Sequence, residues 1–202
     1  MLILENDLKF SGRFITRPYT RRTVVHHSAS GPGTTIEDIH RWHLAKDWAG
    51  IGYHYVIYPD GSIHRGRPEW AKGAHAYQDM QHDANSDGIG ICLIGDFTNI
   101  VPTEAQMVSL IWLVHDIWTR YPGIGVIRHR DVQATACPGD SFPWDEFKAR
   151  LEAGPMPEQW KLDIITESKK EGIITADHNP DEPATKWFVL AIALAVLKRM
   201  GR

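Results

Sequence analysis

The order of hydrophobic and polar positions predicts several short strands. Residues 23–27, "TVVHH", form an apolar β-branched run that ends in two histidines, and 88–97, "GIGICLIGDF", form a continuous apolar run typical of a buried central strand. Residues 52–66, "GYHYVIYPDGSIHRG", alternate around a Pro-Asp-Gly turn and predict a hairpin. "GVIRH" at 125–129 predicts one more short strand.

Three segments have helical spacing instead. In 34–48, Thr34 and Glu37 have the spacing of a capping box, and apolar residues recur at helical intervals behind them. Residues 103–121 predict a long helix packed on the core, and 143–152, "PWDEFKARLE", predict a closing helix. Strands and helices alternate without a regular βαβ order, so we expect an α/β fold, with a mixed central sheet flanked by helices on both faces.

The texture of the chain changes at 154–157, where Gly154, Pro155 and Pro157 predict a linker. We therefore expect a catalytic domain at 1–153 and a small helical segment at 158–202, with helical patterns near 158–171 and 184–200. The second pattern contains "WFVLAIALAVL", which is well short of the ~20 residues of a membrane span. A buried or self-associating helix is the better interpretation of that run, and self-association through it would give a homodimer.

Composition excludes some classes of function. The net charge of −3 and the lack of a basic run give no reason to expect a nucleic-acid surface. The opening "MLILENDLKF" lacks the basic start and long apolar stretch of a secretory signal, so we expect a product made and kept in the reducing cytoplasm unless something releases it. Cys92 lies in an apolar strand and Cys137 in a polar turn, which does not indicate a disulfide framework.

Candidate metal ligands stand at the ends of predicted strands. His26 and His27 are neighbours in a strand, so their side chains point to opposite faces and only one can serve a given site. His129 and Cys137 lie eight positions apart on one loop, and imidazole and thiolate are both good zinc ligands. The sequence has no His-Glu-x-x-His, no zinc-deaminase signature and no Gly-x-Ser-x-Gly, so a zincin protease, a nucleobase deaminase and a serine hydrolase are excluded.

Five blocks in order carry a family resemblance: "VVHHSAS", "GYHYVIYPDGSIHRGRPEW", "GAHA", "GIGICLIGDF" and "HRDVQATACPG". From about residue 20 to 150 the chain resembles the type 2 N-acetylmuramoyl-L-alanine amidases, a family that includes bacteriophage lysozyme-like amidases and peptidoglycan recognition proteins. The resemblance implies zinc-dependent hydrolysis of the amide bond between N-acetylmuramic acid and L-alanine in peptidoglycan.

The resemblance also implies the ligands of one zinc ion per chain, which are His26, His129 and Cys137. Strand alternation then turns His27 to the other side of the sheet, in a structural role. Two histidines and one cysteine leave a fourth position for water, whose pKa a bound zinc lowers to about 7.

Further site residues follow from the same resemblance. Tyr53 is implied as a catalytic residue that orients the water or hydrogen-bonds the oxyanion. Thr135 stands where some relatives carry lysine, and it would donate one hydrogen bond to the oxyanion without a charge. His75, in "GAHA", matches a substrate-binding histidine of the groove. Three tryptophans fit either the walls of the groove or packing: Trp42, Trp48 and Trp70.

Among the roles open to this family, a phage endolysin is favoured, since a chain without a signal peptide would wait in the host cytoplasm and reach the cell wall after release by a holin. A cytoplasmic muropeptide-recycling amidase is one alternative. The other is a recognition module that binds peptidoglycan without cutting it; such proteins typically lose the cysteine ligand, so Cys137 favours catalysis. The segment 158–202 resembles wall-binding segments of phage amidases and equally fits a dimerisation appendage.

Overall fold

The computed structural model describes residues 1–77, 79–80, 83–154, 169–170 and 172. Those up to Gly154 belong to one compact unit, Met1–Pro155. Apart from three positions, the described residues do not include 158–202. The helices predicted near 158–171 and 184–200, and the wall-binding or dimerising role predicted for this segment, therefore concern residues outside the described part. Within the described part, no helix has the length and apolar character needed to cross a membrane.

A six-stranded mixed sheet runs through this unit in the order β1-β4-β3-β5-β2-β6. The strands are β1 (Ile3–Leu4), β2 (Arg22–His27), β3 (Tyr55–Ile57), β4 (Ile63–Arg65), β5 (Gly88–Leu93) and β6 (Gly125–Arg128). The helices are α1 (Ile36–Leu44), α2 (Glu104–Arg120), α3 (Trp144–Ala153) and the short 3-10 turn η1 (His129–Asp131). All neighbouring strands are parallel except the β3–β4 hairpin.

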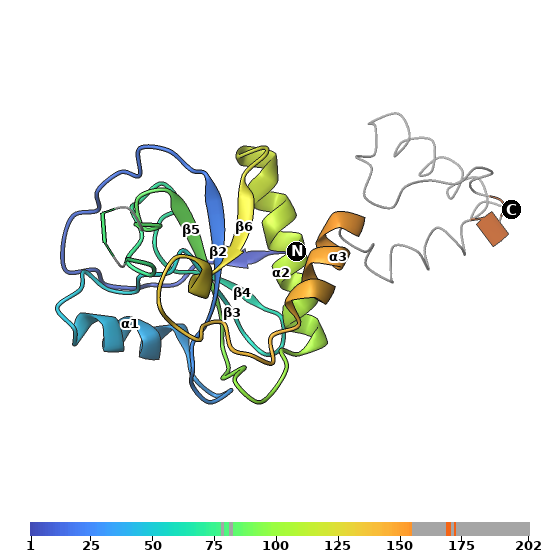
Figure 1. Cartoon of the computed structure of the whole chain (residues 1–202), viewed down its shortest axis with the longest axis horizontal. Helices are drawn as coiled ribbons and strands as arrows, with labels where there is room; N and C mark the ends of the chain where they lie inside the picture. The colour runs from blue at the N-terminus through green and yellow to red at the C-terminus, as the bar shows by residue number, and fades with distance from the viewer. Residues whose placement is uncertain (78, 81–82, 155–168, 171, 173–202) are drawn as a thin grey trace, which may run out of the picture. The chain divides into compact units, whose positions relative to one another are not determined.

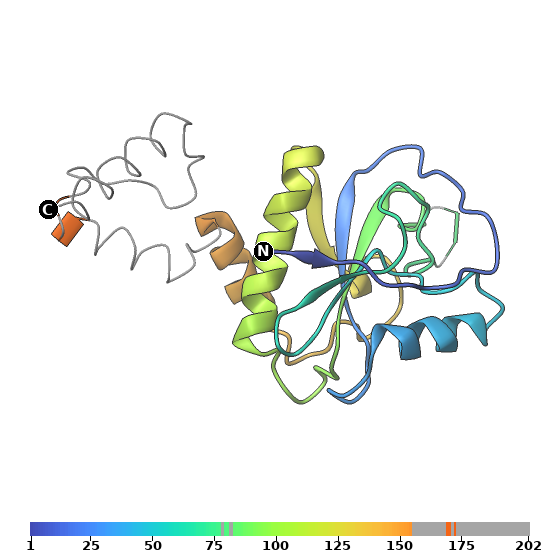
Figure 2. The same ribbon diagram turned by 180° about the vertical axis from the view of Figure 1, so that it is seen from behind.

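Helices cover both faces of the sheet, as the sequence predicts: α2 and α3 lie on one side and α1 on the other (Figures 1 and 2). Alternation along β5 supplies each face. Ile89, Ile91 and Leu93 pack with residues of α2 and α3, whereas Cys92 packs with Ile36 of α1. Each such fully buried aliphatic side chain contributes about 1.5–3 kcal/mol to folding. The mixed sheet with helices on both faces is therefore confirmed.

Some elements differ from the predictions. α1 begins at Ile36 behind an N-cap at Thr35, whose hydroxyl accepts from the Asp38 N–H while the Asp38 carboxylate accepts from the Thr35 N–H. The capping box is thus one residue beyond the predicted Thr34–Glu37 pair, and α1 ends at Leu44 rather than 48. β1 was not predicted, because its two residues are too few to carry an alternating pattern.

Candidate active site

The site begins at the carboxyl end of β2, where His26 pairs in register with Cys92 of β5. The His26 side chain is fully buried on the α1 side of the sheet. Its ring centroid lies 4.3 Å from that of His129, 4.9 Å from that of His75 and 5.0 Å from that of Tyr53. Four residues far apart in the sequence therefore surround one point at the end of a central strand.

The loop after β6 brings His129 and Cys137 to the same point. His129 opens η1 directly after the strand, and the Arg130 N–H donates to the Cys137 carbonyl at 3.0 Å, which closes the loop on itself. The ligand atoms of His26, His129 and Cys137 all lie within 4.8 Å of one another, and the His26 Nδ1 to Cys137 Sγ distance is 3.8 Å. The structure thus brings together the three residues predicted to bind zinc.

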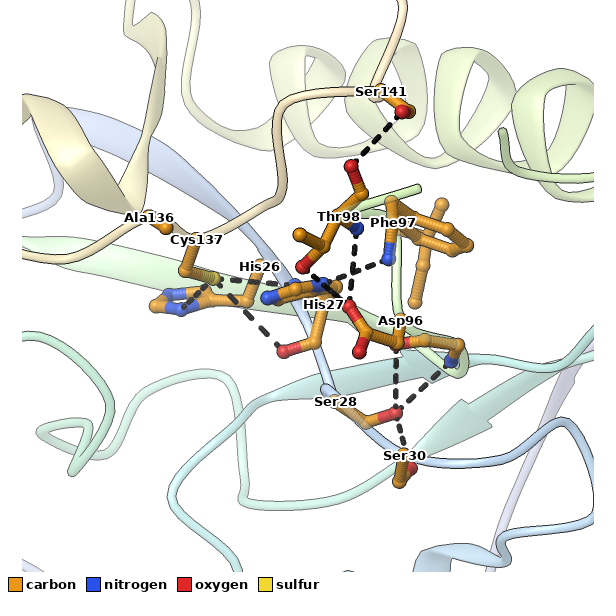
Figure 3. A network of polar contacts seen from close by, with 12 residues as sticks. His26, His27, Ser28, Ser30, Asp96, Phe97, Thr98, Ala136, Cys137 and Ser141 are labelled. Carbon is orange, nitrogen blue, oxygen red and sulfur yellow. Dashed lines mark hydrogen bonds and ion pairs between the residues drawn. The ribbon is translucent and has the colours of Figure 1, made fainter. Parts of the chain in front are cut away.

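His27, the neighbour of His26, has a different environment. Its Nδ1 accepts a hydrogen bond from the Phe97 N–H at 3.1 Å, and its ring packs toward Phe97 in the core under α2. Its backbone N–H donates to Cys137 Sγ at 3.3 Å. Figure 3 shows Cys137 beside the His26 ring, while the His27 ring lies toward Phe97. His27 therefore supports the sulfur through its backbone and the fold through its ring.

Burial sets the protonation of this cluster. It lowers the pKa of His26 and His75 well below the ordinary value for histidine, and it lowers the pKa of His129 as well. Neutral imidazole is the form that binds a metal. Burial also raises the pKa of the Cys137 thiol to about 12, while the His27 N–H and the Arg130 charge favour the thiolate.

Tyr53 stands beside the cluster just ahead of β3. Its ring lies against those of His26 and His43, with the centroid of His43 at 5.6 Å. The close approach of Gly52 to Ala74 fixes this segment: the Ala74 N–H donates to the Gly52 carbonyl, and a Cβ at Gly52 would lie 1.9 Å from the Ala74 oxygen. Burial raises the pKa of the Tyr53 hydroxyl well above its ordinary value, so Tyr53 is a hydrogen-bond donor at neutral pH.

Thr135 is half-buried in the loop of Cys137 and accepts a hydrogen bond from the Cys137 N–H at Oγ1 (3.2 Å). That bond occupies a lone pair of the hydroxyl and leaves its proton able to donate to another group. The three tryptophans are exposed; Trp48 packs on His43 with centroids 4.6 Å apart, and Trp70 packs on Phe14 at 5.9 Å.

His75 is buried beside the cluster, with 7% of its surface exposed. Its Nδ1 is 3.0 Å from His26 Nε2. The contact with substrate that the sequence predicts for His75 stays a prediction, because the most direct contact of its ring is with His26.

Two residues of the site were missed from the sequence. Gln133 places its Oε1 2.7 Å from His129 Nε2, and His43 packs between Trp48 and Tyr53. Gln133 follows His129 by four positions on the ligand loop. That spacing indicates a contact between the two side chains only once the helical turn η1 is known. His43 was assigned to the helix, and its position beside Tyr53 depends on where α1 packs.

The donor set fits a zinc ion. Zinc takes two imidazoles and one thiolate readily, and tetrahedral bonds of about 2.0–2.3 Å would place the donor atoms about 3.3–3.6 Å apart. The 3.8 Å between His26 Nδ1 and Cys137 Sγ is close to that spacing. Three protein ligands leave one position open, which is the pattern of catalytic rather than structural zinc sites.

Comparisons with known proteins identify the family. Residues 16–140 match the family Amidase_2, N-acetylmuramoyl-L-alanine amidase. The endolysin of Enterobacteria phage T3 is 35% identical over 135 residues, which cover 62% of this chain and 85% of the phage protein. Peptidoglycan-recognition protein SC2 of Drosophila melanogaster is 31% identical over 141 residues, which cover 64% of this chain and 73% of the insect protein.

The solved structure of an endolysin N-acetylmuramoyl-L-alanine amidase from Clostridium intestinale superposes with a TM-score of 0.70 at 36% identity, and the match covers 75% of this chain and 95% of that protein. The family match includes His26, Tyr53, His75, His129 and Cys137, and it extends over more than half of the sequence. The chain therefore belongs to the N-acetylmuramoyl-L-alanine amidase family.

Proposed function

We propose that this protein is a zinc-dependent N-acetylmuramoyl-L-alanine amidase, which cuts the amide bond between N-acetylmuramic acid and L-alanine in peptidoglycan. The observation that carries the proposal is the convergence of His26, His129 and Cys137 within 4.8 Å, in a chain of the amidase family. Two histidines and a cysteine with an open fourth position suit hydrolysis of an unactivated amide.

His26, His129 and Cys137 would hold the ion. When bound, zinc supplies a Lewis acid for the amide carbonyl and lowers the pKa of water to about 7. The protein contributes ligands that are already assembled: His26 is buried, the Cys137 sulfur accepts the His27 N–H, and the η1 turn holds His129. The conformational entropy of bringing the three ligands together is therefore lost on folding and not on zinc binding.

Two hydroxyl groups are available for the charge that develops on the scissile carbonyl oxygen. Tyr53 keeps its proton because burial raises its pKa, and it packs directly against His26. Thr135 has its Oγ1 oriented by the Cys137 N–H. We assign Tyr53 as a donor to the water or the oxyanion and Thr135 as a second donor to the oxyanion, each of them neutral. A preorganised donor of this kind contributes about 10²–10³ in turnover.

Lysis of a host cell wall is the biological setting that we propose. The relatives named endolysin cover 62% of this chain and 85% of their own length, so the match includes most of each phage protein. A phage endolysin would be made in the host cytoplasm and would act on peptidoglycan after release. Binding of peptidoglycan without cleavage is the alternative, and the Cys137 ligand weighs against it.

The test is digestion of isolated cell walls by the purified protein, with and without a chelator, followed by analysis of the fragments. We expect new L-alanine amino termini and N-acetylmuramic acid residues with a free lactyl carboxylate, both abolished by the chelator. Wall binding without new termini would instead support a recognition module. New reducing ends or internal peptide cuts would contradict the assigned bond.

A further inference from the structure

The two candidate histidine ligands share one arrangement on their outer sides. His26 Nε2 lies 3.0 Å from His75 Nδ1, and His129 Nε2 lies 2.7 Å from Gln133 Oε1. On its inner side, His26 Nδ1 faces Cys137 Sγ. In both rings Nε2 is therefore occupied by a protein side chain, which leaves Nδ1 as the nitrogen for the metal.

This arrangement fixes where the protons must be. A neutral imidazole that binds a metal through Nδ1 carries its proton on Nε2. The outer partner must then accept a hydrogen bond. Gln133 offers its amide oxygen, and His75 offers Nδ1 if its own proton is on Nε2. Both outer partners are uncharged acceptors, whereas a carboxylate is a common partner of zinc-binding histidines.

The surroundings of His75 hold its ring in place beside His26. Its backbone N–H and that of Ala76 both donate to Asn85 Oδ1, at 2.6 and 2.9 Å. The ring packs against two glycines: a Cβ built at Gly73 or Gly90 would come within 2.5 Å of its Cδ2 atom. Any larger residue at Gly90 of β5 would therefore displace the ring from His26. This close packing favours a fixed orientation of His75.

We propose that His75 and Gln133 are positioning residues, which hold His26 and His129 in the orientation and tautomer that bind zinc through Nδ1. The inference rests on the proposed zinc site and adds to it a role for two residues that are not ligands. Loss of such an outer partner typically weakens metal binding about 10–100-fold. The effect should appear in zinc affinity even when the fold is intact.

Pairs of nearly isosteric variants separate the hydrogen bond from packing. His75→Leu and His75→Asn have the same branching, but only asparagine keeps an acceptor near the position of Nδ1. Gln133→Met and Gln133→Glu have similar lengths, but only glutamate keeps an acceptor oxygen. Because Gln133 is half-buried, its pair carries less risk to folding than the His75 pair.

The measurement is the zinc dissociation constant of each full-length variant, obtained by competition with a chromogenic chelator. Nitrogen NMR of the imidazoles in the zinc-free protein reports the tautomer of His26 directly. We expect His75→Leu and Gln133→Met to bind zinc about 10–100-fold more weakly, His75→Asn and Gln133→Glu to recover most of the loss, and His26 to carry its proton on Nε2 in the unsubstituted chain.

The outcomes distinguish this inference from the proposed function. Zinc binding by the leucine and methionine variants as tight as that of the unsubstituted chain would overturn the positioning role and leave the zinc site standing. Equal losses in both members of each pair would show that packing alone matters, which also overturns it. An unsubstituted chain that binds no zinc would overturn the metal site and the positioning role together.

Discussion

At the scale of single residues, the central feature is that the adjacent histidines His26 and His27 have different roles. Strand alternation turns His26 toward the α1 side and His27 toward the core under α2. Only His26 can approach Cys137 with a ring nitrogen, whereas His27 approaches that sulfur with its backbone N–H. Substitution should therefore remove zinc at position 26 but not at position 27.

We expect His26→Ala to abolish zinc binding and wall cleavage, and His27→Ala to retain zinc. Alanine at 27 keeps the N–H that donates to Cys137 Sγ but leaves the buried Phe97 N–H without its acceptor, which should cost about 1–3 kcal/mol of unfolding free energy. Zinc content by mass spectrometry and chemical denaturation check both statements. Loss of zinc from His27→Ala with retention in His26→Ala would reverse the assignment.

Tyr53 gives the second prediction at this scale. Tyr53→Phe removes one hydroxyl and little packing, so the fold and zinc content should survive while turnover falls by roughly 10² or more, the effect of one lost oxyanion donor. Tyr19→Phe, at an exposed tyrosine, is the matched control and should leave turnover unchanged. Steady-state kinetics on a soluble muropeptide measure the effect. Turnover of Tyr53→Phe equal to that of the unsubstituted chain would show that Tyr53 only contributes packing.

At the scale of elements, buried histidines hold the segments around the site to the sheet. His54 Nδ1 accepts from the Gly90 N–H of β5, and His43 Nδ1 of α1 accepts from the Gly52 N–H, both at 2.9 Å. Burial lowers the pKa of His54 to about 3 and that of His43 to about 4. Both side chains are therefore neutral in the folded protein at any pH near neutrality.

This predicts an acid-sensitive fold. An unfolded histidine has a pKa near 6.5, so below about pH 6.5 the unfolded chain binds protons that the folded chain excludes. The contribution of these histidines to stability should be constant above about pH 7 and fall between about pH 6.5 and 4, by at most about 1.4 kcal/mol per pH unit for each histidine. Melting temperatures of the zinc-free protein across this range measure the effect.

The control for the acid effect is His43→Asn, which keeps an acceptor near Nδ1 but does not titrate. Its melting temperature should depend less on pH between about 6.5 and 4 than that of the unsubstituted chain. Identical pH profiles for the two proteins would show that His43 does not contribute.

How much of these elements can be predicted from sequence depends on whether the signal is local. The hairpin at Pro59-Asp60-Gly61 and the apolar strand β5 follow from turn chemistry and unbroken hydrophobicity. Both are confirmed, although β5 ends at Leu93 and not at Phe97. The cap of α1 at Thr35 was misplaced by one residue, because Thr34 and Thr35 both have an acidic residue three positions later. Local spacing alone cannot choose between them.

The partners of the two ligand histidines could not be predicted in the same way. The ligand set came from ordered motifs, but the hydrogen bonds of His75 to His26 and of Gln133 to His129 depend on how three separate segments meet. Gly90 is required because the His75 ring occupies the space that a side chain at position 90 would fill. This tertiary contact does not change the hydrophobic pattern of β5, so the sequence does not indicate it.

At the scale of the whole molecule, the compact unit Met1–Pro155 already contains every residue of the candidate site. Its last helix, α3, contributes Phe147 and Leu151 to the core against α2. We propose that residues up to the end of α3 form the catalytic domain and that 158–202 form an appendage that binds the wall or mediates dimerisation.

A chain that ends at Gly154 should therefore fold, bind zinc and cleave small muropeptides at close to the full-length rate. If 158–202 bind the wall, the truncated chain should bind sedimented walls more weakly, because tethering raises the local concentration of the active site. If they form a dimer interface, the mass in solution should fall together with wall binding. Sedimentation measurements of the protein's mass in solution, made together with a wall pull-down, distinguish wall binding from dimerisation. A truncated chain that precipitates or loses zinc would contradict the division into a catalytic domain and an appendage.

The central claim is that amide hydrolysis depends on zinc at His26, His129 and Cys137. The most direct test is the rate at which L-alanine amino termini are released from isolated walls, as zinc is added back to metal-free protein. The account predicts no release without metal and a rate that rises to a plateau at one zinc per chain. Full release by the metal-free protein, or a plateau unaffected by Cys137→Ala, would contradict it.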